Sequence, residues 1–89
     1  MPASSETLVA LPDDVALHAR PAAQFVRTAM GFDSSIAVVV GEREANAKSL
    51  LAVLALGARG GTTLRLRAAG DDADTAVTAL AGCVSAFTE

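Results

Sequence analysis

Four short segments have the apolar patterning of β-strands. Residues 7–11 (Thr-Leu-Val-Ala-Leu) are aliphatic and are followed by a Pro-Asp-Asp loop. Residues 35–40 are rich in β-branched side chains, and residues 63–68 alternate strictly between apolar and polar side chains, which predicts a sheet with one face in water. Residues 43–46 are polar and follow a Gly-Glu pair. That pair is typical of a two-residue hairpin with glycine first (type II′), so residues 43–46 are expected to be the return strand.

Three other segments have the three-to-four-residue periodicity of helices. In residues 19–30 it produces one apolar stripe, formed by Ala22, Phe25, Val26, Ala29 and Met30. Pro21 suits the first turn of this helix, and Gly31 is expected to end it in the left-handed conformation common at helix C-termini.

Two further helices follow along the chain. Ser49 can cap a short one over residues 50–56, which Gly57 would end. The last helix is expected to begin near Asp71 and Asp72, whose negative charges suit the positive end of the helix dipole. Its predicted buried stripe consists of Ala73, Ala76, Val77, Leu80, Val84 and Phe87.

The predicted order of elements is βαββαβα. It indicates the α+β class, an open-faced β-sandwich whose four-stranded antiparallel sheet is covered on one face by three helices. With 89 residues the chain is expected to be a single domain over residues 1–89, and residues 1–6 are expected to be flexible. The same order of elements also describes ferredoxin-like binding modules, so it does not decide the function.

Composition excludes several classes of protein. A hydrophobic content of 52% excludes a disordered chain, and the aliphatic runs are too short to span a membrane. The first residues lack the pattern of a secretory signal, so we expect a cytoplasmic protein. The single cysteine, Cys83, excludes an internal disulfide and a multi-cysteine metal site, and it is expected to pack in the core. We expect a monomer without a metal or cofactor.

Charge is distributed unevenly along the chain. The net charge of −3 and the lack of Trp and Tyr argue against nucleic-acid binding. All seven cations lie between residues 15 and 67 with only three acids, so this middle section carries +4 and the two ends carry −7. A basic middle section suits docking to acidic protein surfaces. Scattered charges that serve only solvation explain the pattern nearly as well.

The candidate for chemistry is His18, the only histidine. It lies at or just before the first residue of the helix predicted over residues 19–30. Free N–H groups and the helix dipole make a helix N-terminus attractive to anions, phosphate above all, and Arg20 adds a guanidinium. An imidazole there is a nucleophile beside an anion site. A histidine with only a capping or packing role is the alternative, which the neighbouring Arg20 and Pro21 make less attractive.

The short helix over residues 50–56 is apolar on every side. Since a short helix on a small domain cannot bury its whole circumference, some of Leu50, Leu51 and Leu54 should be exposed, as in a docking surface. A deeply sandwiched helix is the alternative.

Three motifs together resemble the HPr family, the histidine-containing phosphocarrier proteins of the bacterial sugar phosphotransferase system. The first is Leu-His-Ala-Arg-Pro-Ala at residues 17–22. The second is Asn-Ala-Lys-Ser-Leu-Leu at residues 46–51, and the third runs from Leu-Gly at 56–57 to Gly-Thr-Thr-Leu at 61–64. The resemblance extends from residue 7 to about residue 84, in the family's order and spacing.

The resemblance implies a function and roles for particular residues. His18 would accept a phosphoryl group on a ring nitrogen, Nδ1 in the family, from phosphorylated enzyme I, which phosphoenolpyruvate has charged. It would pass the group to a histidine of an enzyme IIA domain for sugar uptake, acting as a carrier rather than an enzyme. Arg20 would pair with the phosphoryl oxygens, and the helix N-terminus at Ala19 and Arg20 would supply N–H donors. The expected docking residues for both partners are Ala19, Arg20, Gln24, Arg27, Lys48, Leu50, Leu51 and Leu54.

Two matters stay open at this level. Ser49 matches a serine that a dedicated kinase phosphorylates in some relatives, but its ordinary role is that of the helix cap, which is slightly favoured. A non-transferring module that uses the same face to regulate an enzyme or a transcription factor is the competing function. His18 argues against it, because a pure regulator could dispense with this residue.

Overall fold

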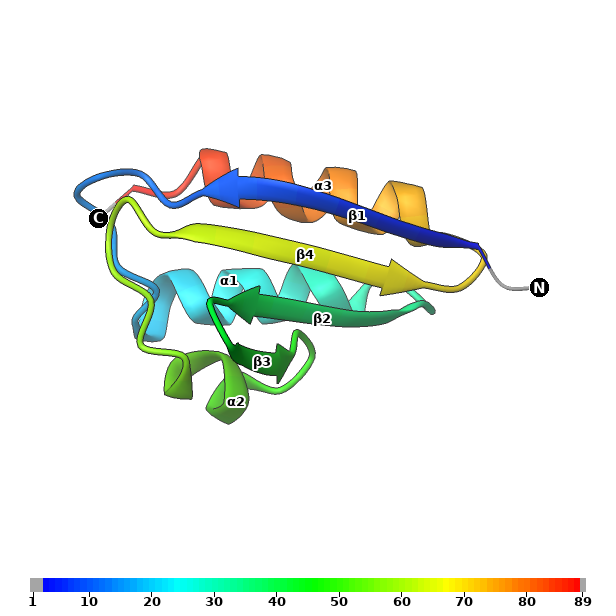
Figure 1. The fold of residues 1–89 in the computed structure, drawn as a ribbon, viewed down its shortest axis with the longest axis horizontal. Coiled ribbons are helices and arrows are strands. Elements are labelled where there is room, and N and C mark those ends of the chain that lie inside the picture. The colour runs from blue at the N-terminus through cyan, green and yellow to red at the C-terminus, as the bar shows by residue number, and fades with distance from the viewer. Residues whose placement is uncertain (1–2, 89) are drawn as a thin grey trace.

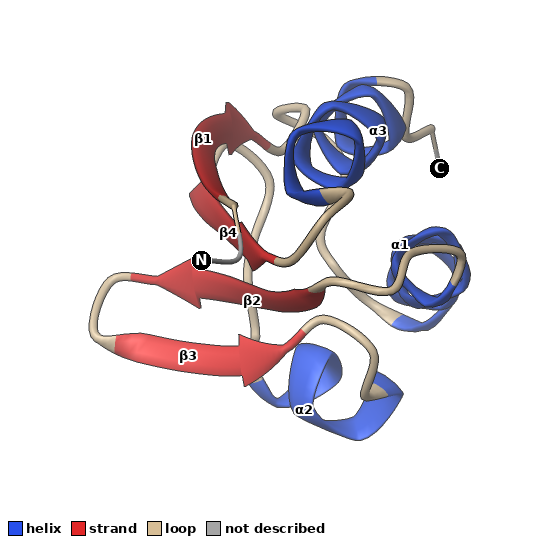
Figure 2. Ribbon diagram, turned by 90° about the vertical axis from the view of Figure 1, so that its right-hand side faces the viewer, coloured by secondary structure: helices blue, strands red, loops and turns tan. Residues whose placement is uncertain are grey.

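The structure, a computed structural model that describes residues 3–88, has four strands and three helices. The elements are β1 (Ser4–Ala10), α1 (Ala19–Met30), β2 (Ser35–Val40), β3 (Arg43–Asn46), α2 (Leu50–Ala55), β4 (Thr63–Ala69) and α3 (Ala73–Ser85). All strand pairs are antiparallel, in the order β1-β4-β2-β3 (Figure 1). Figure 2 shows α1 and α3 side by side over one face of the sheet, with α2 beside β3. The predicted βαββαβα architecture is confirmed.

The first strand is longer than the apolar pattern indicated. It pairs with β4 from Ser4, opposite Ala69, to Ala10, opposite Thr63. The expectation that residues 1–6 are flexible is therefore wrong for residues 4–6, and residues 1–2 lie outside the described range. The physical reason is that ladder hydrogen bonds come from the backbone, so pairing continues beyond the apolar side chains.

The hairpin between β2 and β3 agrees with the prediction. Gly41 has a φ of +59°, and among the described residues only glycines have positive φ, so Glu42 does not. In a type II′ turn, only the first of the two turn residues has a positive φ, so the conformation of Gly41 and Glu42 fits this turn. The turn places Val40 opposite Arg43 and Ala37 opposite Asn46.

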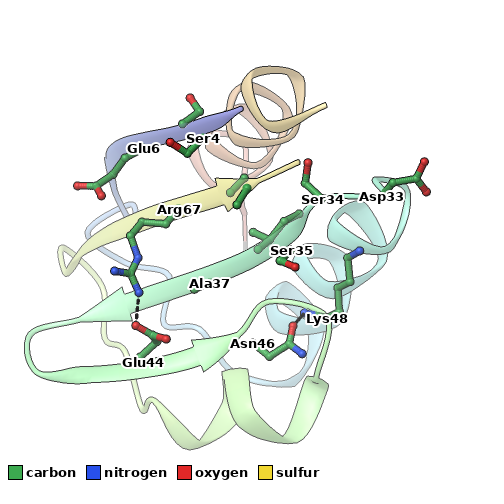
Figure 3. Close-up of a pocket in the computed structure, with 14 residues that line it drawn as sticks. Ser4, Glu6, Asp33, Ser34, Ser35, Ala37, Glu44, Asn46, Lys48 and Arg67 are labelled. Atoms are coloured by element: carbon green, nitrogen blue, oxygen red, sulfur yellow. Dashed lines mark hydrogen bonds and ion pairs between the residues drawn. The ribbon is translucent and has the colours of Figure 1, made fainter. Parts of the chain in front are cut away.

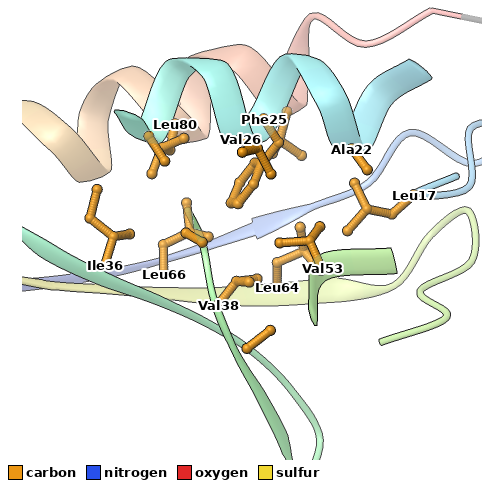
Figure 4. Packing of buried hydrophobic residues seen from close by; sticks show 14 of the residues in the cluster. Leu17, Ala22, Phe25, Val26, Ile36, Val38, Val53, Leu64, Leu66 and Leu80 are labelled. Carbon is orange, nitrogen blue, oxygen red and sulfur yellow. The ribbon is translucent and has the colours of Figure 1, made fainter. Parts of the chain in front are cut away.

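The core fills the space between the helices and the sheet. Alternate residues of β4 point inward, so that Leu64, Leu66 and Ala68 are buried while Arg65 and Arg67 lie on the open face. These side chains meet Phe25 of α1, Val53 of α2 and Leu80 of α3 in one cluster (Figure 4). The predicted stripe of α3 is buried as well, although Phe87 lies just beyond the end of the helix.

Three details of the helices differ from the predictions. Gly31 does follow the end of α1, but with a φ of −76° it stays in the right-handed region. Met30, which the periodicity placed in the apolar stripe of this helix, is 65% exposed, because it is five residues beyond the fully buried Phe25 and hence about 140° further around the helix. Cys83 is only partly buried, and its sulfur accepts a hydrogen bond from the Thr28 hydroxyl at 3.7 Å. It lies between α1 and α3 rather than at the centre of the core.

Asp72, the N-cap residue of α3, connects α3 to the turn before β2. Its carboxylate makes no capping bond to its own helix. Instead it accepts hydrogen bonds from the backbone N–H groups of Asp33 (2.9 Å) and Ser34 (3.0 Å) and from the buried Ser34 hydroxyl. The hydroxyl bond and then the N–H bonds lower the pKa of the Asp72 carboxyl, because they favour its charged form.

We expect this connection to make stability depend on acidity. Since the pKa of Asp72 is depressed in the folded state, its contribution is complete above the unfolded value of about 3.9 and is lost as pH falls through the lower folded value. An Asp72→Asn variant should have a lower Tm than the wild type at pH 7, and the difference should shrink below about pH 4. Thermal unfolding from pH 7 to pH 2 measures this, with Asp74→Asn as the matched exposed control. A constant difference across that range would contradict it.

Candidate functional site

His18 is the N-cap residue of α1, as the sequence predicted. Its backbone is extended (φ −96°, ψ −166°), and its carbonyl accepts the first helical bond from Ala22 at 2.9 Å. The side chain is exposed, and within residues 3–88 no hydrogen bond to the imidazole is formed. The N–H groups of Ala19 and Arg20 likewise have no acceptor within this range, and Pro21 has no N–H. Two free donors and the positive end of the dipole thus lie beside an accessible ring nitrogen.

The loop before His18 is held by the segment that leads into β4. Leu17 donates its N–H to the carbonyl of Ala58 at 2.9 Å, and Leu11 and Thr62 form a similar bond at 2.9 Å. Both Leu17 and Ala58 are buried. Because Leu17 is anchored inward by its side chain and its backbone, the next residue, His18, is presented outward.

Gly60 makes this close contact between the two loops possible. A Cβ at Gly60 would lie 2.1 Å from the carbonyl oxygen of Asp13. Any side chain at this position would therefore push apart the two segments that hold the loop before His18. The sequence pattern indicated only a flexible break there, since the packing of two loops leaves no periodic signal.

The structure brings only part of the basic middle section to His18. Arg20, Gln24 and Arg27 are exposed along α1, and this helix and α2 contain no acidic residue. Arg65 and Arg67, however, lie on the open face of the sheet, where they pair with Glu6 and with Glu44. The strict alternation of β4 sends these two arginines away from the helices. The basic middle section of the sequence therefore does not form one continuous basic face around His18.

The second helix has the exposed surface that its composition predicted. Ser49 caps it by accepting a hydrogen bond from the Ala52 N–H at 3.3 Å. Leu50 is 40% exposed and Leu51 is 81% exposed, while Leu54 is half-buried. Only Val53 is fully buried, so a deeply sandwiched helix is excluded.

The remaining predicted residue, Lys48, lies between the two helices. Its ammonium group donates to the carbonyl of Phe32 at 2.6 Å, and its N–H donates to the side chain of Asn46 at 2.9 Å. Lys48 is half-buried and fixed, so it joins the start of α2 to the end of α1 rather than extending freely into solvent.

A hollow of the structure lies away from His18. It has a volume of about 780 Å³ and lies on the open face of the sheet, bordered by Ser35, Glu44, Lys48 and Arg67 among others (Figure 3). His18 does not line this hollow and is exposed at the end of a helix. Such a position suits a protein partner, since a small substrate is usually enclosed by a pocket.

Residues 3–88 contain no helix that is both long and apolar enough to cross a membrane, and no group of three potential metal ligands.

Comparison with known proteins identifies the family. A family model described as the PTS HPr component phosphorylation site matches residues 5–86. The chain belongs to the HPr family. It is a phosphocarrier of the phosphotransferase system, not a catalyst, and the partners of this family are in general enzyme I and enzyme IIA.

Individual relatives support this assignment. The phosphocarrier protein HPr of Mycoplasma capricolum is 39% identical over 70 residues, which is 79% of each chain. That of Haemophilus influenzae is 48% identical over 61 residues, 68% of this chain and 72% of its own. Among solved structures, HPr from Bacillus anthracis superposes with a TM-score of 0.87 at 33% identity, covering 92% of this chain and 98% of that one.

A relative named as a catabolite repression protein is structurally more distant. The solution structure of Crh from Bacillus subtilis superposes with a TM-score of 0.71 at 32% identity, covering 94% of this chain and 100% of that one. A relative named for catabolite repression therefore exists, as the competing function of a regulator would require. This chain, however, superposes better on HPr from Bacillus anthracis than on Crh.

Proposed function

We propose that His18 is the residue that carries the phosphoryl group, with Nδ1 as the accepting atom. The observation that supports this is the combination of an exposed, unbonded imidazole at the N-cap of α1 with two free N–H groups and Arg20 next to it. Phosphorylated enzyme I is the donor, and a histidine of an enzyme IIA domain is the acceptor that follows.

The transfer needs little from the protein except placement and charge. The lone pair of Nδ1 attacks phosphorus in line, a nitrogen–phosphorus bond forms, and the bond to the donor breaks with its electron pair returning to the donor atom. Nε2 keeps its proton during the attack. Neutral imidazole is available near pH 7, so no separate base is required. The N–H groups of Ala19 and Arg20 and the dipole of α1 offset the charge of the phosphoryl oxygens.

Arg20 is proposed to pair with the phosphoryl oxygens. Its planar guanidinium can donate two parallel hydrogen bonds to them. A carrier must also release its cargo, and every 1.4 kcal/mol of extra stabilisation shifts the equilibrium about tenfold toward the loaded carrier. An exposed site with one arginine beside the histidine therefore suits a carrier better than a deep pocket would.

The proposed docking surface for both partners follows α1 and α2. It consists of Ala19, Arg20, Gln24, Arg27, Lys48, Leu50, Leu51 and Leu54. The exposed cations on α1 would attract acidic partner surfaces, and the exposed leucines on α2 would be buried against an apolar part of the partner.

For Ser49 we propose the structural role of the N-cap, which its hydroxyl fills. Phosphorylation by a serine kinase is the second proposal. A phosphate there would be tolerated by the start of α2 but would disturb the apolar surface at Leu50 and Leu51. We further propose a cytoplasmic monomer that requires no metal or cofactor and binds no nucleic acid.

The test is phosphoryl labelling of the whole chain with purified enzyme I and labelled phosphoenolpyruvate. We expect one phosphoryl group per chain, labile in acid and stable in alkali, which is discharged when an enzyme IIA domain is added. A chain that takes up no label, yet is captured by a regulatory enzyme or repressor, would support the competing function of a regulator.

A further inference from the structure

The helix α2 depends on contacts with the rest of the chain to keep its position. It has six residues, and an isolated helix of that length is unstable in water. Val53 is its one fully buried residue, and the buried cap residue Leu56 is the other anchor in the core. Since the exposed leucines of α2 belong to the proposed docking surface, whatever fixes α2 also fixes that part of the surface.

Lys48 ties the start of α2 to the end of α1. It directly precedes Ser49, the N-cap residue of α2, and its side chain extends toward the turn that follows α1 (Figure 3). The ammonium group donates to the carbonyl of Phe32 at 2.6 Å, a charge-assisted bond that is stronger than one between neutral groups. Phe32 in turn donates its N–H to the carbonyl of Ala29 at 3.2 Å, so the acceptor of Lys48 is itself held to the last turn of α1.

The surroundings of this bond suit a cation that stays in place. Carbonyl groups at the end of a helix carry the negative end of its dipole, which favours a positive charge there. Lys48 is half-buried, and its own N–H donates to the side chain of Asn46 at 2.9 Å, so its backbone is held as well. A partner protein that paired with this ammonium group would first have to break its bond to Phe32.

A second cation holds the other end of α2. Arg43 of β3 donates from Nη1 to the carbonyl of Leu56, the C-cap residue of α2, at 3.3 Å. The helix is thus tied to α1 at its start and to β3 at its end. The bond of Lys48 is the shorter of the two, and it joins α2 to the helix that begins at His18.

We propose that Lys48 is a positioning residue for docking: it holds α2 where enzyme I can engage His18 and the leucines of α2 together. The inference rests on the proposed function, and it makes Lys48 contribute to the docking surface from within the carrier rather than by touching the partner. Without this bond α2 occupies its place only part of the time, and the apparent affinity falls by that fraction. The chemistry is unaffected, because His18 and Phe32 lie at opposite ends of α1, which spans about 18 Å.

The test is the steady-state kinetics of enzyme I with variants of the carrier. Lys48→Met removes the donor and the charge but keeps an unbranched apolar stem, so the fold should persist. We expect the KM for the carrier to rise about tenfold, with kcat unchanged at saturation. Lys48→Arg keeps a charged donor and should recover most of the affinity, and Arg43→Met should have a smaller effect because its bond is longer. Arg65→Met is the matched control, since it removes one positive charge from the open face and should keep the wild-type KM.

Two further readouts separate positioning from a direct charge contact. In Lys48→Met the amides of Val53 and Leu56, which bond within α2 and its cap, should exchange hydrogen faster, while those of Leu64 and Leu66 in β4 should not change. The ratio of the variant KM to the wild-type KM should also be the same at about 0.05 M and about 0.5 M salt, because salt screens exposed charges far more than a half-buried bond inside the carrier.

Each other outcome identifies what has failed. An unchanged KM for Lys48→Met, with His18 still labelled, would overturn the positioning role and leave the proposed function standing. A KM defect that disappears at the higher salt, without faster exchange in α2, would mean that Lys48 touches the partner directly. Faster exchange in β4 as well would indicate a general loss of stability, and this too would overturn the inference. Absence of label on the wild type would refute the proposed function itself.

Discussion

A His18→Ala chain should take up no phosphoryl group from enzyme I and phosphoenolpyruvate. His18 is the only histidine in the sequence, so no other imidazole can accept the group. The rate should fall to background, while the Tm should stay close to that of the wild type, because the side chain is exposed and unbonded. Labelling followed by acid and alkali treatment measures the first effect, and thermal unfolding measures the second.

A second variant separates chemistry from helix capping. His18 is the N-cap of α1, so its loss could in principle fray the helix that presents Arg20. Asn is among the best N-cap residues and can bond to the free N–H groups of the first turn. His18→Asn should therefore hold α1 at least as well as the wild type and still take up no label. Label on either variant would mean that another residue is the acceptor.

Arg20→Ala should slow transfer about 100-fold, the effect typical of removing one donor that stabilises transition-state charge. The loss should appear in kcat, with KM for enzyme I changed far less, because the proposed contact is to the phosphoryl oxygens. Stopped-flow or quenched-flow transfer from phosphorylated enzyme I measures it. Arg20→Lys should recover part of the rate, since it keeps the charge but lacks the two parallel donors.

The control for this variant is Arg65→Ala. Arg65 is also an exposed arginine, but it pairs with Glu6 on the open face at 3.7 Å. Its replacement removes the same charge from the chain and should leave both kcat and KM unchanged. If Arg20→Ala raised KM alone, Arg20 would contribute to docking and not to the transfer step.

Much of the fold could be predicted because each element has a local signal. The alternation in residues 63–68 predicted both β4 and its two faces, and the stripe in residues 19–30 predicted α1 to the residue. The Ser49 cap was predictable because a hydroxyl before an apolar run satisfies a free N–H. The predictions were wrong at two element boundaries that the backbone sets and the side-chain pattern does not. Backbone pairing with β4 extends β1 back to Ser4, and Gly31 ends α1 without a left-handed turn.

The arrangement of charges shows the limit of sequence reasoning. Counting along the chain placed seven cations in one section, yet Arg65 and Arg67 lie on the opposite face from His18. Asp72 was expected to serve the dipole of its own helix, but its carboxylate holds Ser34, a residue far away in the sequence. The first outcome follows from the alternation in residues 63–68, which a count of charges along the chain ignores. The second depends on which distant segments meet, and no local pattern records that.

The sequence by itself determined the elements, their order, and the candidate acceptor at the start of a helix. These depend on neighbouring residues: periodicity, caps, and the position of His18 relative to Pro21. Only the tertiary structure decided that Leu17 is anchored to Ala58, so that His18 points outward, and that Met30 at the end of α1 lies exposed. These depend on contacts between segments distant in the chain, where packing and not periodicity sets which side chains remain in water.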